Sequence, residues 1–258
     1  MRATSKGNQI DSPGSSTRYA ELASALVKDI VAGRHVVGSL LPTEHELAEQ
    51  RGVSRHTVRA ALKLLQDLGY ITRKKSVGTL VESANPETAY TQSFGTAEDL
   101  VRVAATEVRA IENEHRVTLD RAAARRLEAP VGSEWLLFAG TRVDVRKGRT
   151  PVAWADIYID VTLARIAKAV RNNPEVLVSF LIEREAGQVI AEIRQVVTAT
   201  LIEVPLARVL GVAAGSAGLR LVRHYKDAAG KILEITDTIY PADRVSVASQ
   251  LKRSKAPL

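Results

Sequence analysis

Residues 43–81 read TEHELAEQRGVSRHTVRAALKLLQDLGYITRKKSVGTLV, and this stretch decides the fold of the first third of the chain. Thr43 stands three residues before Glu46, which is the spacing of a capping box at the start of a helix. Gly52 is suited to end that helix, and Ser54 is suited to cap a second one. Apolar residues then recur at helical spacing and predict a buried stripe of Val58, Ala61, Leu62 and Leu65. The stretch therefore predicts a helix-turn-helix.

Polar and basic side chains are left largely on the other face of the second helix, namely Arg55, His56, Thr57, Arg59 and Lys63. Donors at the start of such a helix reach base edges in the major groove of DNA. The extended segments 70–73 and 78–82, joined by residues 74–77, predict a hairpin, or wing. From residue 55 to residue 75, six basic residues stand against one acidic residue, which favours contact with phosphates. The alternative is a solvated helix face beside a charged turn, but the charges coincide with a capped helix pair and a hairpin, which favours DNA.

The run from Arg18 to Glu82 resembles the winged helix-turn-helix of GntR-type bacterial transcription regulators. The matching residues are Gly38–Pro42 (GSLLP), Thr43, Glu44, Val53, Ser54, Arg55, Thr57, Val58, Arg59, Ala61, Leu62, Leu65, Gly69, Gly78 and Thr79. The resemblance implies that Arg55 and Arg59 approach bases or nearby phosphates. It also implies that Thr43, Glu44 and Thr57 meet the DNA backbone and that Gly78 lets the wing enter the minor groove.

His45 departs from this pattern, because the family usually has Arg after the Glu, so one DNA contact of the family is not expected here. The residues that we assign to the DNA contact surface are Thr43, Glu44, Arg55, His56, Thr57, Arg59, Lys75, Gly78 and Thr79.

The composition narrows the class of protein. A chain of 258 residues can form two domains with separate cores, and its net charge of +7 favours a polyanionic partner. The absence of cysteine excludes disulfides, thiolate metal sites and Cys nucleophiles. The sequence shows no apolar run long enough to cross a membrane and no signal peptide, so we expect a soluble, cytoplasmic protein. The five His residues lack metal-ligand spacing and no GxxxxGK[ST] phosphate loop is present, so we expect neither a metal nor a cofactor.

Changes in composition divide the chain. Residues 1–17 are polar and predict a disordered arm. Residues 18–82 form the predicted DNA-binding domain, in which a first helix over 19–30 buries Leu22, Ala23, Leu26, Val27 and Ile30. Residues 83–90 are the expected linker, since Asn85-Pro86 stops regular structure. Residues 91–250 form a second domain, and 251–258 a tail.

The second domain alternates strand-like and helix-like segments. The expected strands are 107–112, 135–145, 152–159, 189–202, 219–225 and 232–240, and the expected helices are 119–127, 161–170, 175–185 and 205–210. Their sum is a mostly antiparallel sheet with helices packed on one side, so the chain as a whole is of the α+β class.

Carboxylate, hydroxyl and guanidinium groups of this domain are the candidates for a ligand site. Glu234 and Tyr240 are six residues apart on one strand and share a face. Both could accept from or donate to a hydroxylated or amino-bearing ligand, and Arg142 on a neighbouring hairpin could hold a carboxylate or phosphate with two donors. Two alternatives stay open. Arg142 and Glu234 could form an ion pair across strands, and Tyr240 could be a packing residue at the strand end. Asp243 and Arg244 are expected to fix the chain end to the body of the domain.

The order of segments over residues 91–250 resembles UTRA, the effector-sensing domain of HutC-type members of the GntR superfamily. The residues that support this resemblance are Arg142, Pro151, Tyr158, Ser179, Leu210–Val212, Arg223, Asp227, Gly230, Glu234, Thr236, Tyr240, Asp243 and Arg244. The resemblance implies a fold shared with chorismate lyase, used to hold a small metabolite. It supports Arg142, Ser179, Glu234 and Tyr240 as effector-binding residues, together with Ser93 and Phe94.

Two positions depart from members that bind phosphorylated sugars, because Gly140 replaces a second basic residue and Ala155 stands where some members have Glu. We therefore do not infer an amino-sugar phosphate as the effector.

The function that these patterns predict is a metabolite-responsive transcription regulator, a homodimeric repressor that a small-molecule effector releases from operator DNA. One alternative is a chorismate-lyase-like enzyme fused to a DNA-binding domain, with Asp156 and Glu234 as paired carboxylates. The other is a constitutive DNA-binding protein whose second domain only dimerises. The sequence does not identify the effector or the operator.

Overall fold

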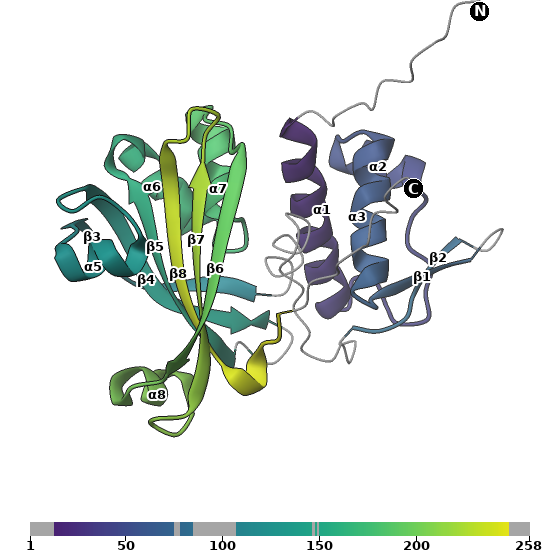
Figure 1. The fold of residues 1–258 in the computed structure, drawn as a ribbon. Helices are drawn as coiled ribbons and strands as arrows, with labels where there is room; N and C mark the ends of the chain where they lie inside the picture. The colour runs from purple at the N-terminus through teal and green to yellow at the C-terminus, as the bar shows by residue number, and fades with distance from the viewer. Residues whose placement is uncertain (1–12, 75–77, 85–106, 146–147, 149, 248–258) are drawn as a thin grey trace, which may run out of the picture.

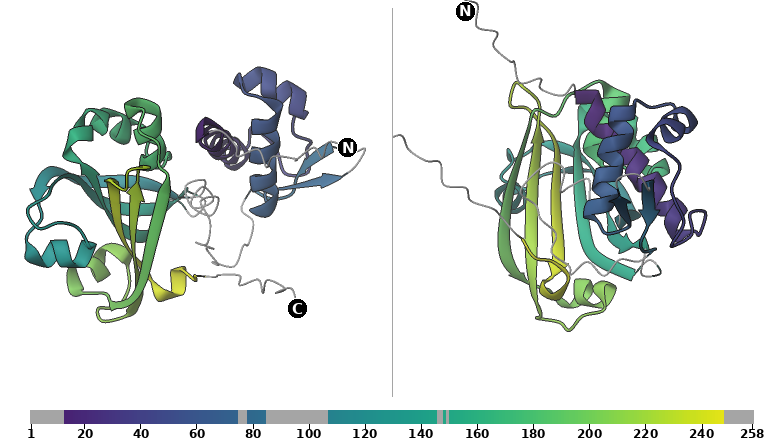
Figure 2. Two further views of the ribbon diagram at one scale, coloured as in Figure 1. Left: turned by 45° about the horizontal axis from the view of Figure 1, so that its top comes forward. Right: turned by 90° about the vertical axis from the view of Figure 1, so that its right-hand side faces the viewer.

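The computed structural model describes residues 13–74, 78–84, 107–145, 148 and 150–247 (Figure 1). A helical domain with a two-stranded wing (residues 13–84) precedes a domain built on a six-stranded sheet (residues 107–247). In Figure 1 and the left view of Figure 2, α1 is the helix of the helical domain nearest the sheet domain, and the wing points away from it. No helix in the described ranges has the length and apolar character needed to cross a membrane.

Three helices and a hairpin make up the helical domain. They are α1 (Pro13–Val31), α2 (Glu44–Arg51), α3 (Arg55–Asp67), β1 (Ile71–Lys74) and β2 (Gly78–Val81). The five apolar residues expected on the first helix are all buried, and they share one core with the apolar stripe of α3. The helix itself begins earlier than expected, at Pro13, within the residues 1–17 for which the sequence predicts a disordered arm. Pro13 suits a first helical position, because proline lacks the N–H that would be unbonded there.

The predicted caps form as expected. Thr43 accepts a hydrogen bond from the Glu46 N–H at 3.3 Å, and the Glu46 carboxylate accepts one from the Thr43 N–H at 2.7 Å. Gly52 ends α2 in the left-handed region at φ 62°, and Ser54 accepts from the Thr57 N–H at 3.1 Å. These local bonds fix the angle between α2 and α3 and so place the start of α3 at the surface.

Six antiparallel strands form the sheet of the second domain, in the order β3-β4-β5-β8-β7-β6. Their bounds are β3 (Glu107–Thr118), β4 (Glu134–Asp144), β5 (Thr150–Asp160), β6 (Glu192–Leu201), β7 (Ala217–Lys226) and β8 (Ile232–Pro241). Each strand lies within a few residues of its prediction except β3, which runs six residues beyond the expected 107–112. Its second half pairs with β4 although its side chains are mostly exposed, so the alternating pattern that marks a strand is missing there.

The helices cover both faces of the sheet, so the expectation of helices on one side is wrong. On one face lie the 3₁₀ helix η2 (Val161–Ile166), α6 (Ala167–Asn172), α7 (Val178–Leu181) and the π-helical turn η3 (Ile182–Ala186), packed on Phe138 and Ile157. On the other face α5 (Arg121–Leu127) packs on Trp135 and Leu137. Successive residues of a strand point to opposite faces, and β4 is buried on both, which permits a helix on each side. The remaining helix α8 (Val204–Leu210) forms a small core with Ile202.

A bulge in β3 closes over Gly140 of β4. The register between the two strands shifts between Ile111 and Asn113. A Cβ atom at Gly140 would lie 2.1 Å from the carbonyl oxygen of Ala110 and 2.9 Å from the nitrogen of Glu112. Because both atoms belong to the backbone, position 140 accepts only glycine in this fold.

Candidate functional site

The start of α3 presents an exposed basic surface. Arg55, His56 and Arg59 are exposed, as a DNA-reading helix requires. Thr57 differs, because its side chain is buried and its hydroxyl lies 2.9 Å from the Ser54 hydroxyl. The expectation that Thr57 lies on the polar face is therefore wrong. The reason is positional: the third residue of a capped helix turns toward the cap and the core.

Glu44 connects the three elements of this surface. Its carboxylate accepts hydrogen bonds from Arg59 of α3, at 3.2 Å, and from Arg73 of β1. The hydrogen bond from Arg59 lowers the pKa of Glu44, so the carboxylate stays charged. Glu44 lies outside the basic stretch 55–75 in the sequence, but in the structure its carboxylate lies beside two cations of that stretch, Arg59 and Arg73. The carboxylate holds both guanidinium groups in place and partly neutralises them.

The wing pairs as predicted, with Ile71 opposite Val81 and Lys74 opposite Gly78. Gly78 has φ 120°, a backbone conformation that residues other than glycine rarely adopt. Thr79 is half-buried, and its carbonyl oxygen accepts from the Leu41 N–H at 2.8 Å, which braces the wing against the segment before α2. Lys75 lies outside the described residues.

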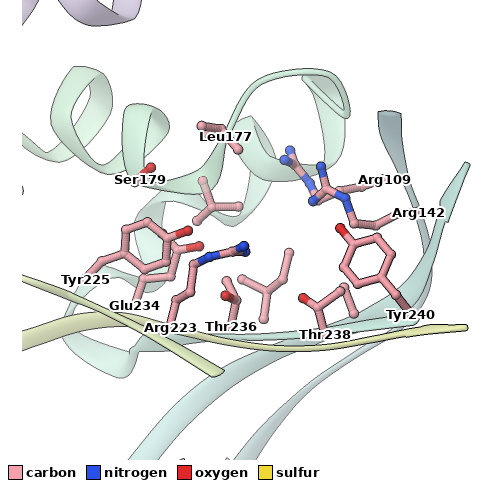
Figure 3. A pocket seen from close by; sticks show the side chains of 13 residues that line it. Arg109, Arg142, Leu177, Ser179, Arg223, Tyr225, Glu234, Thr236, Thr238 and Tyr240 are labelled. Carbon is pink, nitrogen blue, oxygen red and sulfur yellow. The ribbon is translucent and has the colours of Figure 1, made fainter. Parts of the chain in front are cut away.

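A polar pocket lies between the sheet and the segment that leads into α7 (Figure 3). Strands β4, β5, β7 and β8 supply its floor. The lining residues are Arg109, Arg142, Ala155, Ile157, Leu177, Val178, Ser179, Arg223, Tyr225, Glu234, Thr236, Thr238 and Tyr240. Its cavity has a volume of about 30 Å³.

Four of the expected effector residues, Arg142, Ser179, Glu234 and Tyr240, line this one pocket. The proposed ion pair of Arg142 with Glu234 is not what the structure shows, since Arg142 Nε lies 3.0 Å from Glu107 Oε2. The Tyr240 hydroxyl lies 3.4 Å from the same Glu107 oxygen. Ser93 and Phe94 lie outside the described residues, and an effector role for all six stays a prediction.

Sequence reasoning missed a second set of lining residues, of which Arg109, Arg223 and Tyr225 are the most polar. Two of them could have been found from strand pairing. Residues directly opposite each other in an antiparallel pair share a face, and Tyr225 is opposite Glu234 while Arg223 is opposite Thr236. Arg109 is likewise opposite Arg142, but the weak alternating pattern of β3 gives little basis for predicting this pairing from the sequence.

Burial sets the protonation of the acid in this pocket. Desolvation of the buried Glu234 carboxyl raises its pKa to about 8, against the attraction of the surrounding arginines. At neutral pH Glu234 is therefore mostly protonated and can donate a hydrogen bond. Burial also lowers the pKa of Arg109 to about 10. This value is still well above 7, so the side chain is charged at neutral pH. The pocket thus combines permanent positive charge with a neutral carboxylic acid.

Three polar atoms of the pocket have no hydrogen-bond partner in the described part of the chain. They are Arg109 Nε, Glu234 Oε2 and Thr236 Oγ1. A buried polar atom without a partner is costly, and native proteins satisfy nearly all of them. Three such atoms around one cavity indicate a site for a polar ligand or for water.

The paired carboxylates considered for an enzyme do not meet. Asp156 is directly opposite Asp237, whereas Glu234 is opposite Ile159, so the alternation of β5 places Asp156 and Glu234 on opposite faces of the sheet. Asp156 instead accepts from Trp154 Nε1 at 2.8 Å, and burial raises its pKa. Within the described ranges, no cluster of three or more His, Asp or Glu side chains could hold a metal ion.

Of the two residues expected to fix the end of the domain, Arg244 does so, whereas the Asp243 side chain is 75% exposed. Arg244 donates hydrogen bonds of 2.8 Å to the carbonyl oxygens of Pro151 and Leu210.

Two families match this chain. Residues 18–81 match the bacterial regulatory proteins of the gntR family. Residues 102–246 match the UTRA domain, and this second match alone covers more than half of the chain.

Curated proteins match about a quarter of the chain. The chain is 43% identical over 70 residues to the HTH-type transcriptional regulator Rv0792c of Mycobacterium tuberculosis, over 27% of this chain and 26% of that protein. It is 36% identical over 70 residues to the arabinose metabolism transcriptional repressor of Geobacillus stearothermophilus, over 27% of this chain and 19% of that protein. These matches span about a quarter or less of the length of the curated relatives.

A solved structure matches nearly the whole chain. PhnF from Mycobacterium smegmatis aligns with 90% of this chain and 100% of its own, with a TM-score of 0.52 and 22% identity. At this level of identity the match shows that the two proteins share a fold.

Proposed function

Because the chain belongs to the GntR family of bacterial regulatory proteins and carries a UTRA domain, we propose that it is a metabolite-responsive transcription regulator. In this proposal Arg55, His56 and Arg59 read operator DNA. Thr43, Glu44 and the wing residues Lys75, Gly78 and Thr79 lie at its backbone and minor groove. A small-molecule effector binds in the pocket of the sheet domain and changes the affinity for DNA. The match to a repressor of arabinose metabolism favours repression as the mode of action.

The observation that carries the proposal is the set of buried polar atoms without partners around the pocket. A domain that only dimerised would have no need for Arg109 Nε, Glu234 Oε2 and Thr236 Oγ1 to face one small cavity. A ligand that accepts from Arg109 and bonds to Glu234 and Thr236 would offset the cost of leaving these groups unbonded. This favours a sensor over a constitutive DNA-binding protein.

We propose that the protein acts as a homodimer, for a geometric reason. One recognition helix reads only a few base pairs, whereas two related by a two-fold axis read a pair of half-sites. Two copies also roughly double the number of phosphate contacts and steepen the dependence on salt. The effector must bind two arrangements of the dimer with different affinity, since equal affinity shifts no equilibrium.

The test has two arms. Selection from random duplex DNA should yield a two-fold symmetric site, and sedimentation of the complex should show two chains per duplex. A thermal-shift screen of metabolites should then find a compound that stabilises the wild type and lowers operator binding. Glu234→Gln and Arg142→Lys should reduce that stabilisation without loss of operator binding.

Failure of each arm has a separate meaning. If no DNA sequence is enriched at low salt, the regulator proposal is wrong. If DNA is enriched but no compound stabilises the protein, the constitutive alternative is favoured.

A further inference from the structure

One segment of the sheet domain faces both the pocket and the helical domain. We call residues 173–184 the roof segment, because Leu177 and Ser179 lie above the pocket in Figure 3 and line it together with Val178. The opposite side of this segment contacts α1. Phe180 packs against the core of the helical domain and also against a core of the sheet domain. The roof segment is therefore shared by the two domains.

The pocket is too small for a metabolite while the roof segment is in this position. Its volume of about 30 Å³ accommodates one or two water molecules. An apolar cavity that accepts a ring the size of benzene measures roughly 150 Å³. A metabolite can therefore enter only if part of the pocket wall moves.

The roof segment is the part of the wall that lies outside the sheet. The floor strands β4, β5, β7 and β8 lie inside the sheet, and each is hydrogen-bonded to a neighbouring strand on both sides. The roof segment consists of a turn, the four-residue helix α7 and part of the π-helical turn η3. Arg109 ties its start to the sheet, donating to the carbonyl oxygens of Val176 and Asn173, the latter at 2.6 Å. The third side-chain nitrogen of Arg109, Nε, is buried and has no hydrogen-bond partner among the described residues.

The ion pairs between the roof segment and α1 can be broken at low cost. Lys28 lies 3.0 Å from Glu175, and Arg184 lies 2.8 Å from Glu21. All four side chains are partly exposed, and ion pairs of this kind contribute little to stability. Between α1 and the roof segment lies a second cavity of about 250 Å³, lined on the α1 side by Ala20, Ser24 and Ala25 among others. The packing therefore leaves room for the roof segment to shift.

From these contacts, and resting on the proposed function, we propose that filling the pocket displaces the roof segment and that α1 responds to this displacement. The ion pairs of Lys28 and Arg184 carry the signal within one chain. Because α1 packs on α3 in a single core, a change at α1 reaches the helix that reads DNA.

A substitution in the floor can mimic an occupied pocket. Thr236 lines the pocket from β8, so Thr236→Leu adds a larger apolar side chain beneath the roof segment, while Thr236→Val keeps the volume and serves as the reference. Hydrogen exchange of the full chain is the measurement. Relative to Thr236→Val, Thr236→Leu should speed exchange of the roof amides 177–181 and of the α1 amides 20–31 by about tenfold. If Thr236→Leu does not fold, Ala155→Leu fills the same pocket from β5.

Removal of the two ion pairs tests the route. In the background Lys28→Met/Arg184→Met the roof amides should still respond to Thr236→Leu about tenfold, but the α1 amides by less than about twofold. The matched background Lys231→Met/Arg194→Met breaks two exposed ion pairs inside the sheet domain and should leave both responses intact.

Each other outcome overturns the inference. An unchanged roof would show that another wall of the pocket moves. If exchange of the α1 amides does not change while exchange of the roof amides does, the signal takes another route. The same follows if the α1 amides still respond after both ion pairs are removed. No DNA is present in this experiment, so its result stands apart from the DNA selection that tests the proposed function.

Discussion

The two domains use arginine in opposite ways. In the helical domain the Arg59 side chain is 60% exposed and shares the Glu44 carboxylate with Arg73. In the sheet domain the Arg142 side chain is only 12% exposed and lies against the buried carboxylate of Glu107. An exposed guanidinium can exchange a carboxylate for a phosphate at little cost, whereas a buried one cannot lose its partner without a large penalty. Exposed arginines such as Arg59 suit reversible binding of a partner, and buried arginines such as Arg142 suit a site whose shape must be fixed.

The largest expected effect follows from the buried pair. Arg142→Met should lower the free energy of unfolding by about 3–5 kcal/mol, because Glu107 would remain buried without its cation. The double variant Glu107→Gln/Arg142→Met should recover most of this loss. Urea unfolding followed by circular dichroism measures both. A loss below about 1 kcal/mol for Arg142→Met would mean that the pair behaves like the exposed pairs of the helical domain.

Protonation of Glu234 should make the stability of the sheet domain depend on pH. Its folded-state pKa of about 8 lies above the unfolded value of 4.5, so the folded state holds the proton more tightly. The stabilisation is fully present below pH 4.5 and is lost as the pH rises through about 8. Between pH 5 and pH 9 the wild type should lose roughly 2–5 kcal/mol more than Glu234→Gln does. Parallel losses in the two proteins would show that Glu234 is ionised at neutral pH.

For the exposed arginines the effect should appear in binding rather than in stability. Arg59→Ala should weaken binding to the selected operator about 10- to 100-fold while the unfolding curve stays unchanged. Arg208→Ala, an exposed arginine on α8, is the matched control and should leave operator binding intact. Anisotropy titrations of labelled DNA compare the three proteins. Equal affinity for wild type and Arg59→Ala would remove α3 from the DNA contact.

The smallest effect is expected at Glu44. Glu44→Gln removes the charge that Arg59 and Arg73 share, so affinity for random duplex DNA should rise about two- to fivefold at low salt. Preference for the operator should fall, because the two guanidinium groups lose the carboxylate that orients them. Glu49→Gln makes the same change in charge on the same helix and controls for net charge. If both variants gain affinity equally, Glu44 acts through charge alone.

The same contrast explains what the sequence could predict. The helical domain follows from signals within a few residues, since the capping box of Thr43 and Glu46 and the stop at Gly52 each decide their own turn. The pocket depends on contacts that are distant in sequence. Arg109 reaches the carbonyl of Val176, 67 residues away, through a strand whose pairing the local pattern does not reveal. Side-chain alternation on β8 predicts that Glu234 and Tyr240 share a face, but it does not predict which helices cover that face.

The bulge of β3 over Gly140 also has a consequence for how this sensor could change its ligand. A basic residue at position 140, expected in sensors of phosphorylated sugars, would place its Cβ atom against the backbone of Ala110. Substitution there would require a deletion or rearrangement in β3 at the same time. A basic side chain therefore cannot be introduced at position 140 by a single substitution, because the path of a neighbouring backbone excludes it.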